Sequence, residues 1–542
     1  MQLPRCPEIS RSHLVVPAVL SLGLSGAVAH GQTNEDLKLN AQDGEPGDKF
    51  GSSVALSGTT ALIGSPLDGD NGLYSGAAYL FDVTTGQQLT KLSPSDGAED
   101  QRFGITVALS GQMALVGAFG DADNGPLSGA AYVFDATSGQ ELFKLTASDG
   151  AQDDWFGRAV AISGQVVVIG ADQDDDDGSR SGSAYVFDIS TGQELFKLTA
   201  SDGEANDLFG CSVAISGDLA LVGSLGDDDN GSASGSAYLF DITTGTELLK
   251  LTAPDGSKGD EFGQAVAIRG DVAVVGAWGK NVVGSNSGTA YVFDVTTGQQ
   301  TLTLTPNDAA GGDWFGRSVA IGEDEVVIGS FHHDTYGYSD AGTAYVFDLT
   351  TGKQTRKLAA SDASLSDWLG RSVGISGGLA LVGASLDDDL GASSGSAYLF
   401  DLDPDCATRY CDASQNPNNA AVIDIDTCDS AAPSIQVCLA GAPANQFVYL
   451  LVGDGSGTVS QPPGAKGDLC VVGGSCLGRY DKDVGQITSA GTFTTDIQNA
   501  LSNPCAGAVA IAPGATWNFQ YWHRQPMGQP ATFSDAISVT FE

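Results

Sequence analysis

The chain has 542 residues, of which 67 are Asp or Glu and 24 are Lys or Arg, so its formal net charge at pH 7 is −43. A surface this negative repels phosphate backbones and no basic stripe interrupts it, which excludes nucleic acid as a partner. With 73 glycines and no convincing helical periodicity, the composition is typical of a β chain rich in tight turns, and the length leaves room for a second domain.

The first predicted element is a secretory signal peptide over residues 1–29. Arg5 and Arg11 precede an apolar run at 14–24, and Ala27-Val28-Ala29 offers a small-x-small cleavage site. No later stretch is long and apolar enough to predict a transmembrane segment. We therefore expect export and a secreted, extracellular or cell-surface location.

Seven copies of one phrase follow over residues 37–403, each pairing a Phe-Gly, or Leu-Gly in the last copy, with a downstream Gly-[ST]-Ala-Tyr-[VL]-Phe-Asp or a close variant. Five steps between successive anchors are 53 residues long and the last is 54. The anchors are Phe50, Phe103, Phe156, Phe209, Phe262, Phe315 and Leu369. A period of this length indicates stacked units that cannot bury their apolar faces alone.

Each unit contains four predicted strands. In the third copy they lie at 158–163, 166–170, 182–188 and 193–199, each rich in Val, Ile, Phe or Tyr and bounded by turn residues. Four antiparallel strands repeated seven times predict an all-β fold, a seven-bladed β-propeller of four-stranded blades.

The two ends of the repeat region complement one another. The seventh copy stops after Phe400-Asp401 without a fourth strand, whereas residues 37–44 match the fourth strand of the third copy at 196–203. We therefore predict that the N-terminal strand completes the last blade and closes the ring, which removes exposed sheet edges.

A second domain is predicted over residues 404–542, with strands at 447–453, 517–521 and 537–541. Seven of the nine cysteines lie there: Cys406, Cys411, Cys428, Cys438, Cys470, Cys476 and Cys505. Exported chains oxidise such clusters, so we expect a disulfide-containing β-sandwich-like domain. Seven is odd, so one cysteine is free, bonded to another chain or paired with Cys211. A zinc site at Cys470 and Cys476 is the rival interpretation.

The repeats resemble FG-GAP repeats, the blade units of integrin alpha-chain propellers and of many secreted bacterial proteins. The resemblance rests on the Phe-Gly openings and on Gly64-Ser65-Pro66, with looser versions such as Gly117-Ala118 in the other copies. It implies a propeller with a binding or cell-adhesion role, although propellers host several functions. Calcium-binding integrin blades carry a D-x-D-x-D-G loop between the first two strands, where this chain has bare turns such as Ser216-Gly217-Asp218. Calcium at that family position is therefore not expected.

Acidic residues instead crowd the link after the second strand of most blades. Repulsion between adjacent carboxylates, about 1 kcal/mol per pair in water, favours a counter-charge, and calcium prefers oxygen ligands of this kind. The candidate calcium ligands are Asp68, Asp70, Asn71, Asp121, Asp123, Asn124, Asp174, Asp176, Asp227, Asp229, Asn230, Asp387 and Asp389. The alternative is that these loops serve only solubility.

Two further aspartates recur before the anchors. One lies seven residues ahead, at Asp43, Asp96, Asp149, Asp202, Asp255, Asp308 and Asp362. The other lies two residues ahead, at Asp48, Asp154, Asp207, Asp260, Asp313 and Asp367. We expect the first set to accept backbone N–H bonds in turns, with metal binding as the alternative. In a four-stranded antiparallel blade, these links and the second-to-third-strand links leave from the same face.

Arg158, Arg317 and Arg371 follow their anchor dipeptides directly. We expect them to pair with neighbouring aspartates; the alternative is a ring that binds an anionic group. His332 and His333 in the sixth blade admit a transition-metal site, although adjacent residues rarely face one ion.

The sequence offers little sign of catalysis. It has five histidines and no recognisable nucleophile elbow or metalloprotease helix, so no catalytic residue is assigned. We expect a non-catalytic binding or adhesion scaffold whose acidic face binds an extracellular protein or glycan. The alternative is a secreted hydrolase on a propeller frame, whose carboxylate pair would be hidden among the many acids.

Overall fold

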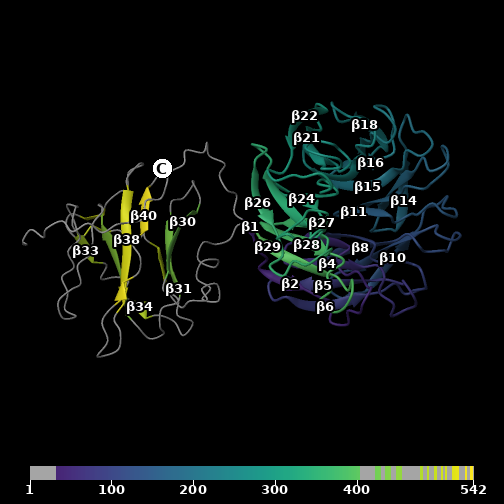
Figure 1. Ribbon diagram of the computed structural model, residues 1–542. Coiled ribbons are helices and arrows are strands. Elements are labelled where there is room, and N and C mark those ends of the chain that lie inside the picture. Colours follow the sequence, from purple (N-terminus) through teal and green to yellow (C-terminus); the bar gives the residue numbers. More distant parts are fainter. Residues whose placement is uncertain are drawn as a thin grey trace, which may run out of the picture. The chain divides into compact units, whose positions relative to one another are not determined.

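The computed structural model describes residues 32–402 and, beyond them, the backbone of strands between Val422 and Thr540. The chain divides into two compact units, Met1–Asp401 and Leu402–Glu542. In the first unit the strands form seven sheets around a common axis (Figure 1). No helix occurs among residues 32–402. The predicted seven-bladed propeller of four-stranded blades is therefore confirmed, whereas the predicted signal peptide lies outside the described residues.

The first four blades run from the inner to the outer strand in chain order. Their strands are β3 (Ser53–Ser57), β4 (Thr60–Ser65), β5 (Ala77–Asp82) and β6 (Gln87–Leu92); β7 (Thr106–Ser110), β8 (Met113–Ala118), β9 (Ala130–Asp135) and β10 (Glu141–Leu145); β11 (Ala159–Ser163), β12 (Val166–Ala171), β13 (Ser183–Asp188) and β14 (Gln193–Leu198); β15 (Phe209–Ser216), β16 (Leu219–Ser224), β17 (Ser236–Asp241) and β18 (Thr246–Leu251). The third blade matches its predicted strands to within one residue at each end.

Blades five to seven continue the pattern, with a strand from the N-terminus in each of the last two. Their strands are β19 (Phe262–Arg269), β20 (Val272–Ala277), β21 (Thr289–Asp294) and β22 (Gln299–Leu304); β23 (Ser318–Ile321), β24 (Glu325–Ser330), β25 (Thr343–Asp348), β26 (Gln354–Leu358) and β1 (Gln32–Thr33); β27 (Leu369–Ser376), β28 (Leu379–Ala384), β29 (Ser396–Asp401) and β2 (Leu37–Leu39).

The middle strands of each blade are covered on both faces by the neighbouring blades. In β12, Val167, Val168 and Ile169 are fully buried although they point alternately to opposite faces. This explains why these strands are continuous apolar runs, while the outer strand β14 alternates between exposed and less exposed residues.

The Phe-Gly anchor locks one blade to the next. Phe103 is fully buried, and its ring meets those of Tyr132 and Phe134 edge-on, with centroids 5.5 and 5.8 Å away. The following Gly104 has a φ of 87°, which glycine adopts without strain. Its carbonyl oxygen approaches Gly64 of the previous blade so closely that a Cβ on Gly64 would collide with it. One contact between blades thus requires a glycine at position 64, in Gly64-Ser65-Pro66, opposite Gly104 of the anchor dipeptide.

Hydroxyl groups on the inner strands make a second set of links between blades. Ser53 Oγ donates to the carbonyl of Gly104 at 2.9 Å, and Ser372 Oγ donates to that of Gly51 at 2.9 Å. Equivalent bonds through Thr106, Ser212 and Ser318 join blades two and three, four and five, and six and seven. These hydroxyls line the centre of the wheel, where their protons are already used in hydrogen bonds to glycine carbonyls.

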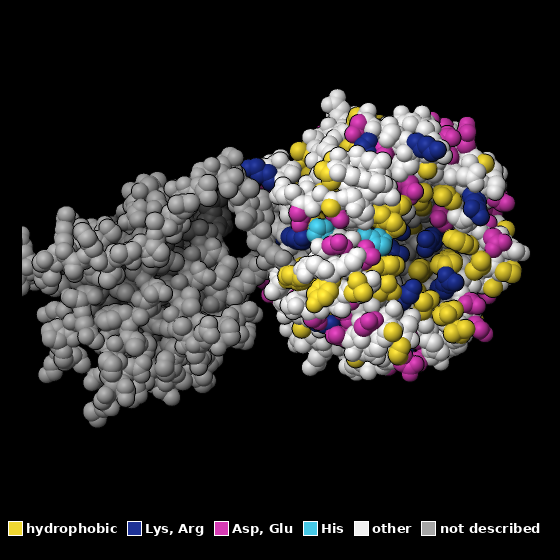
Figure 2. Space-filling model, viewed as in Figure 1, with side chains coloured by type: hydrophobic (Ala, Val, Ile, Leu, Met, Phe, Trp, Pro, Cys, Tyr) yellow, Lys and Arg dark blue, Asp and Glu magenta, His cyan; other side chains and the backbone are white. Residues whose placement is uncertain are grey.

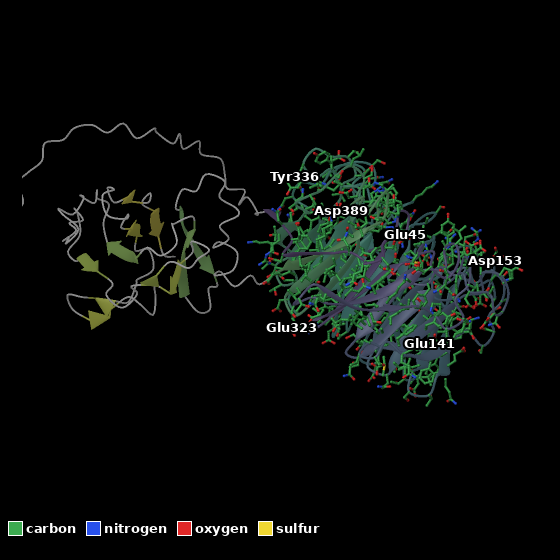
Figure 3. The ribbon with its side chains drawn as sticks, turned by 90° about the horizontal axis from the view of Figure 1, so that it is seen from below. Glu45, Glu141, Asp153, Glu323, Tyr336 and Asp389 are labelled. Atoms are coloured by element: carbon green, nitrogen blue, oxygen red, sulfur yellow. The ribbon has the colours of Figure 1, made fainter. Side chains whose placement is uncertain are left out.

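The N-terminal segment lies beside the last two blades. Strand β2 pairs antiparallel with β29, placing Lys38 opposite Tyr398. Strand β1 pairs parallel with β26, a contact that the sequence analysis did not predict. Blades seven and one also meet through the hydrogen bond from Gly47 N to the carbonyl of Ala392 at 2.9 Å, between the loops that carry Glu45 and Asp389 (Figure 3).

The second unit contains three small sheets. They are formed by β30 (Val422–Cys428), β31 (Ser434–Ala440) and β35 (Phe493–Asp496); by β32 (Phe447–Gly453), β33 (Leu477–Arg479), β34 (Gly485–Gln486), β38 (Thr516–His523), β39 (Thr532–Phe533) and β40 (Ile537–Thr540); and by β36 (Ser502–Asn503) and β37 (Gly507–Ala508). Its side chains are outside the described residues, so the sandwich, disulfides and zinc alternative stay predictions. Within the described part of the chain, no helix is long and apolar enough to cross a membrane.

Candidate functional site

Both acidic links lie at one end of the wheel, which we call the loop face. In the third blade Ala159, at the start of β11, lies opposite Gly170, near the end of β12. The link that enters β11 and the link that leaves β12 are therefore at the same end of the blade. The two acid sets meet on this face, as the strand order predicts.

A lysine from the outer strand joins the two acid sets in most blades. Lys91 Nζ lies 2.9 Å from Asp43, 2.8 Å from Asp68 and 2.6 Å from Asp70. We call this arrangement a lysine–aspartate cluster. Equivalent clusters form around Lys144 (Asp96, Asp121, Asp123), Lys197 (Asp149, Asp174, Asp176), Lys250 (Asp202, Asp227, Asp229) and Lys38 (Asp362, Asp387, Asp389).

A buried tyrosine in each cluster donates its hydroxyl to the aspartates. Tyr185 is fully buried, and its hydroxyl lies 2.9 Å from Asp149 and 2.8 Å from Asp174. Burial and the adjacent carboxylates raise the pKa of Tyr185, so its hydroxyl keeps its proton and donates. This tyrosine belongs to the repeat phrase, which explains its place in every blade.

The charges within a cluster stabilise one another. Burial opposes the charge of Lys91, but the hydrogen bonds that Lys91 donates to Asp68, Asp70 and Asp43 outweigh it and raise the pKa of Lys91. Burial also opposes the charge of Asp43, and Lys91 overcomes this and lowers the pKa of Asp43. The ammonium group therefore stays charged beside three aspartate side chains, at the short distances expected of charge-assisted hydrogen bonds.

The predicted calcium ligands are only partly brought together. In four blades three aspartate oxygens lie within 4.8 Å of one another, in the sets Asp43–Asp68–Asp70, Asp96–Asp121–Asp123, Asp202–Asp227–Asp229 and Asp362–Asp387–Asp389. These oxygens are the ones that the lysines contact. Asn71, Asn124 and Asn230 donate their backbone N–H groups to serine hydroxyls, and the calcium role predicted for their side-chain amides stays a prediction.

Blades five and six replace the loop aspartate with a basic residue. Lys280 stands where blade one has Asp68, and Thr303 stands where it has Lys91. Lys280 Nζ reaches Asp260 at 2.9 Å and Asp255 at 3.3 Å, and it also bonds the carbonyl of Asp255. The ammonium thus comes from the loop instead of the strand, and blade five keeps its cation.

The two adjacent histidines of blade six face different partners. His332 Nδ1 lies 2.8 Å from Asp340, while His333 Nδ1 lies 3.1 Å from Asp313. His333 Nε2 lies 2.8 Å from Lys357 Nζ, so a charged Lys357 donates to it and the Nδ1 proton points to Asp313. The pair does not converge on one point, which does not fit the transition-metal alternative.

The aspartate two residues before six of the seven anchors caps its own loop. Asp154 accepts the backbone N–H of Ala151 at 2.6 Å, and Asp367 accepts that of Ser364 at 2.5 Å. Burial, together with nearby carboxylates, raises the pKa of Asp154 and Asp367 to about 6. A turn role is thus found for this set as well as for the aspartate seven residues before the anchor, where a backbone hydrogen bond also helps to lower the pKa of Asp43 and Asp149.

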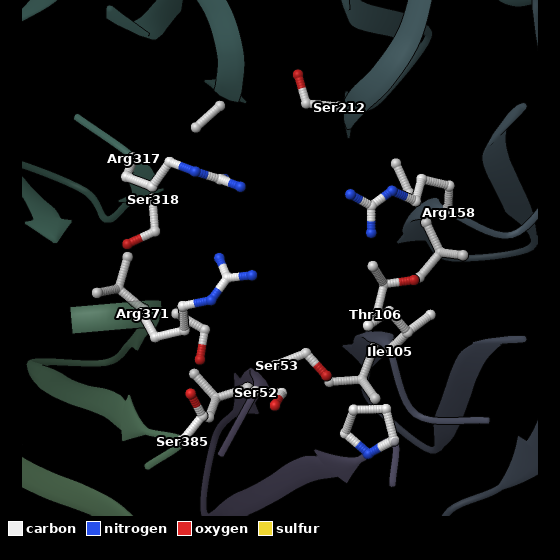
Figure 4. Close-up of a pocket in the computed structure, with 18 of the residues that line it drawn as sticks. Ser52, Ser53, Ile105, Thr106, Arg158, Ser212, Arg317, Ser318, Arg371 and Ser385 are labelled. Carbon is white, nitrogen blue, oxygen red and sulfur yellow. The ribbon is translucent and has the colours of Figure 1, made fainter. Parts of the chain in front are cut away.

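The residues after the anchor dipeptides line a central cavity of about 590 Å³. The guanidinium groups of Arg158, Arg317 and Arg371 point from opposite sides toward its middle (Figure 4). The predicted ion pairs with neighbouring aspartates are wrong, because none of the three side chains makes a salt bridge with any acid among residues 32–402. The aspartates that were expected to pair with them are bonded to loop N–H groups.

Aromatic side chains surround the mouth of this cavity. Trp155 packs on Phe119 with ring centroids 5.1 Å apart, and Trp314 packs on Trp278 at 4.4 Å. Trp368 packs on Phe331 at 5.3 Å. Figure 2 shows basic and hydrophobic side chains gathered at the hollow of the wheel, with acidic side chains mostly farther out. The loop face therefore has a basic, aromatic centre inside an acidic surround.

Two features of the loop face were not predicted, although each has a recurring pattern in the sequence. A lysine recurs five residues before the aspartate in Lys91–Asp96, Lys144–Asp149 and Lys197–Asp202, and its regular spacing marks it as part of the acidic site. A tryptophan precedes the anchor in the three blades that place an arginine in the central cavity after it, giving Trp-[Phe/Leu]-Gly-Arg.

Comparison with known families agrees with this architecture. A family model described as FG-GAP repeat matches residues 33–81, 87–134, 140–187, 193–240, 246–293, 299–347 and 353–400. Each match begins at or just before an outer strand and ends in the third strand of the following blade, so the first match includes β2. No curated protein matches the chain. Since the seven matches cover more than half of its length, the chain belongs to the FG-GAP repeat family.

Proposed function

We propose that the protein is a secreted, non-catalytic binding scaffold whose loop face binds an extracellular protein. The observation that carries this proposal is the position of its exposed apolar side chains. Eight of the twelve large hydrophobic residues that are exposed among the described residues 33–402 lie in loop-face links: Leu73, Tyr74, Val282, Val283, Tyr336, Tyr338, Leu365 and Leu390. Exposed apolar groups gathered on one face are typical of interaction sites.

The clusters support this role because they hold the loops in place before any partner binds. Asp68 is tied to Lys91 and Tyr79, and its backbone carbonyl accepts the hydroxyl of Ser75 at 3.1 Å. A loop that is already ordered loses less conformational entropy when it binds.

The test is a binding screen of the full mature chain on extracellular matrix proteins and a glycan array. A protein hit should be weakened by Leu365→Ser or Val283→Ser, which change side chains 62% and 59% exposed on the loop face. Leu89→Ser is the matched control, since Leu89 is 55% exposed but lies on an outer strand. A glycan hit that the same substitutions weaken would show that the partner is a glycan and not a protein. Turnover of a chromogenic ester or glycoside that one point mutation abolishes would instead support the hydrolase alternative.

Calcium is the cation proposed for the aspartate-rich loops. Three carboxylates within 4.8 Å fit part of a calcium shell, which takes six to eight oxygens. The cluster lysine contacts the same aspartates, so a bound calcium ion would displace the ammonium group from them. Melting curves with calcium chloride and with chelator test this: a higher Tm in calcium supports the proposal, and a chelator-independent curve contradicts it.

Closure of the ring by the N-terminal strand belongs to the same proposal. It is supported by the pairing of β2 with β29 and by the contacts of Lys38 with Asp362, Asp387 and Asp389. Removing residues 32–41 from the mature chain should lower the Tm strongly, because the seventh blade loses both an edge strand and its only described cluster lysine. An unchanged Tm would contradict closure.

A further inference from the structure

We propose that the central cavity of the loop face binds an oxyanion, such as a sulfate or phosphate group. Five basic side chains line the cavity, namely Lys49, Arg102, Arg158, Arg317 and Arg371, and no acidic side chain of the described residues does. None of the five takes part in an ion pair within residues 32–402. The chain as a whole has 67 acidic residues against 24 lysines and arginines, so a cavity lined by basic residues alone is the reverse of the overall composition.

The basic groups come from matching positions of the repeat. Blades three, six and seven place an arginine after the anchor dipeptide, and blades one and two place Lys49 and Arg102 before it. All these positions lie at the loop end of the inner strands, so five of the seven blades each contribute one cation to one cavity. An oxyanion at the centre would be approached from several sides.

Aromatic packing holds the guanidinium planes while leaving their edges free. Arg158 lies 5.6 Å from the Phe119 ring and 5.8 Å from the Trp155 ring, and Arg371 lies 5.5 Å from the Phe331 ring. A guanidinium stacked in this way keeps its N–H edge for bidentate bonding to an oxyanion. The inner-strand hydroxyls are not free to donate to the anion, because they already donate to glycine carbonyls of the next blade.

Electrostatics inside the cavity favours an added negative charge. Burial, with repulsion from Arg371 and Arg158, lowers the pKa of Arg317 to about 9. Two acids act on these arginines through space without pairing: Asp172 on Arg158 and Glu261 on Arg317. An oxyanion would replace the missing counter-charge, and a cavity of about 590 Å³ can also admit a small group that carries it.

This inference does not require that the loop face bind a protein, because its probe is an ion. Isothermal titration of the full mature chain with sodium sulfate, at an ionic strength held constant with sodium chloride, should show one saturable site. Arg317→Gln/Arg371→Gln should weaken sulfate binding by about tenfold to a hundredfold or more, the loss expected from removing charged hydrogen bonds. Arg158→Gln, from the opposite side of the cavity, is the second variant and should weaken binding as well.

The matched control is Arg269→Gln, since Arg269 is half exposed and pairs with Glu323 at 2.8 Å away from the cavity. It should bind sulfate as the wild type does. Glucose 6-sulfate, with glucose as the neutral control, separates two sources of the oxyanion: tighter binding than free sulfate indicates a sulfated sugar, and equal or weaker binding indicates the free ion. No saturable binding by the wild type, or equal binding by folded cavity variants, would overturn the inference.

Discussion

The lysines of the clusters and the arginines of the central cavity occupy the same end of the propeller in opposite electrostatic states. Lys91 Nζ has three carboxylates within 2.9 Å, whereas Arg317 has no salt bridge among the described residues. The first state raises the pKa of the base and the second lowers it. The repeat therefore neutralises part of its own charge at the periphery and leaves positive charge without an ion-pair partner among the described residues at the centre.

The lysines and the arginines differ because the first occupy positions that are repeated from blade to blade and the second occupy a position that varies. Cluster residues recur in nearly every blade, because each blade must hold its own loop. The position after the anchor dipeptide varies instead, through Ser52, Ile105, Arg158, Cys211, Gln264, Arg317 and Arg371. We infer that the repeated residues stabilise the fold and that the varied ones determine the lining of the central cavity.

The largest expected effect is on stability when a cluster loses its lysine. Lys91→Met leaves Asp43, Asp68 and Asp70 without their cation, and Asp68 is buried. We expect the free energy of unfolding to fall by about 2–4 kcal/mol, somewhat below the cost for a fully buried pair because Lys91 is partly exposed. Urea denaturation measures this change.

The control for that variant is Lys353→Met, an exposed lysine in the turn between β25 and β26. Its effect should stay within about 0.5 kcal/mol. Equal effects of the two substitutions would show that the cluster contributes nothing specific.

Blade five provides a sharper test, because its cation comes from the loop. Lys280→Asp alone leaves Asp255 and Asp260 uncompensated, and Thr303→Lys alone places a second cation beside Lys280. The double variant recreates the arrangement of the other blades. We expect each single change to destabilise and the pair to be coupled by about 2 kcal/mol, measured by a double-mutant cycle in urea. Additive effects would contradict the shared role.

The pH dependence of stability should reflect two kinds of aspartate. The pKa of Asp154 and Asp367 is raised to about 6, so between about pH 4 and 6 the folded state holds more protons than the unfolded state and stability rises as pH falls. Below about pH 4 the aspartates whose pKa is lowered, such as Asp43 and Asp149, take up protons and leave their lysines, so stability falls. Melting curves from pH 3 to 8 should have a maximum on the acidic side of neutrality. A steady rise to pH 8 would contradict this assignment.

The smallest effect concerns the hydroxyls that line the cavity. Ser318 Oγ donates to the carbonyl of Gly370 at 2.9 Å, between blades six and seven. Ser318→Ala should therefore cost about 1 kcal/mol of stability and leave sulfate affinity unchanged. Loss of sulfate binding without loss of stability would assign the hydroxyl to the ligand.

The sequence alone predicted the propeller, its seven blades and the strands within them, because the period and the turn residues determine these features. It also predicted that both acid sets share one face, since that follows from strand order. It did not show that Lys91 reaches Asp43, which lies in the preceding link, 48 residues earlier. It gave the wrong partners for the arginines, because proximity in sequence to Asp154 and Asp367 hid the bonds that these aspartates make with their own loops.

The most direct test compares Arg317→Met with Lys91→Met in chloride buffer free of sulfate and phosphate, using the free energy of unfolding in urea. Arg317→Met should leave stability unchanged or raise it, because it removes repulsion from Arg158 and Arg371, whereas Lys91→Met should lower it. A loss for Arg317→Met as large as that for Lys91→Met would show that the central arginine already has a structural partner and would contradict the account.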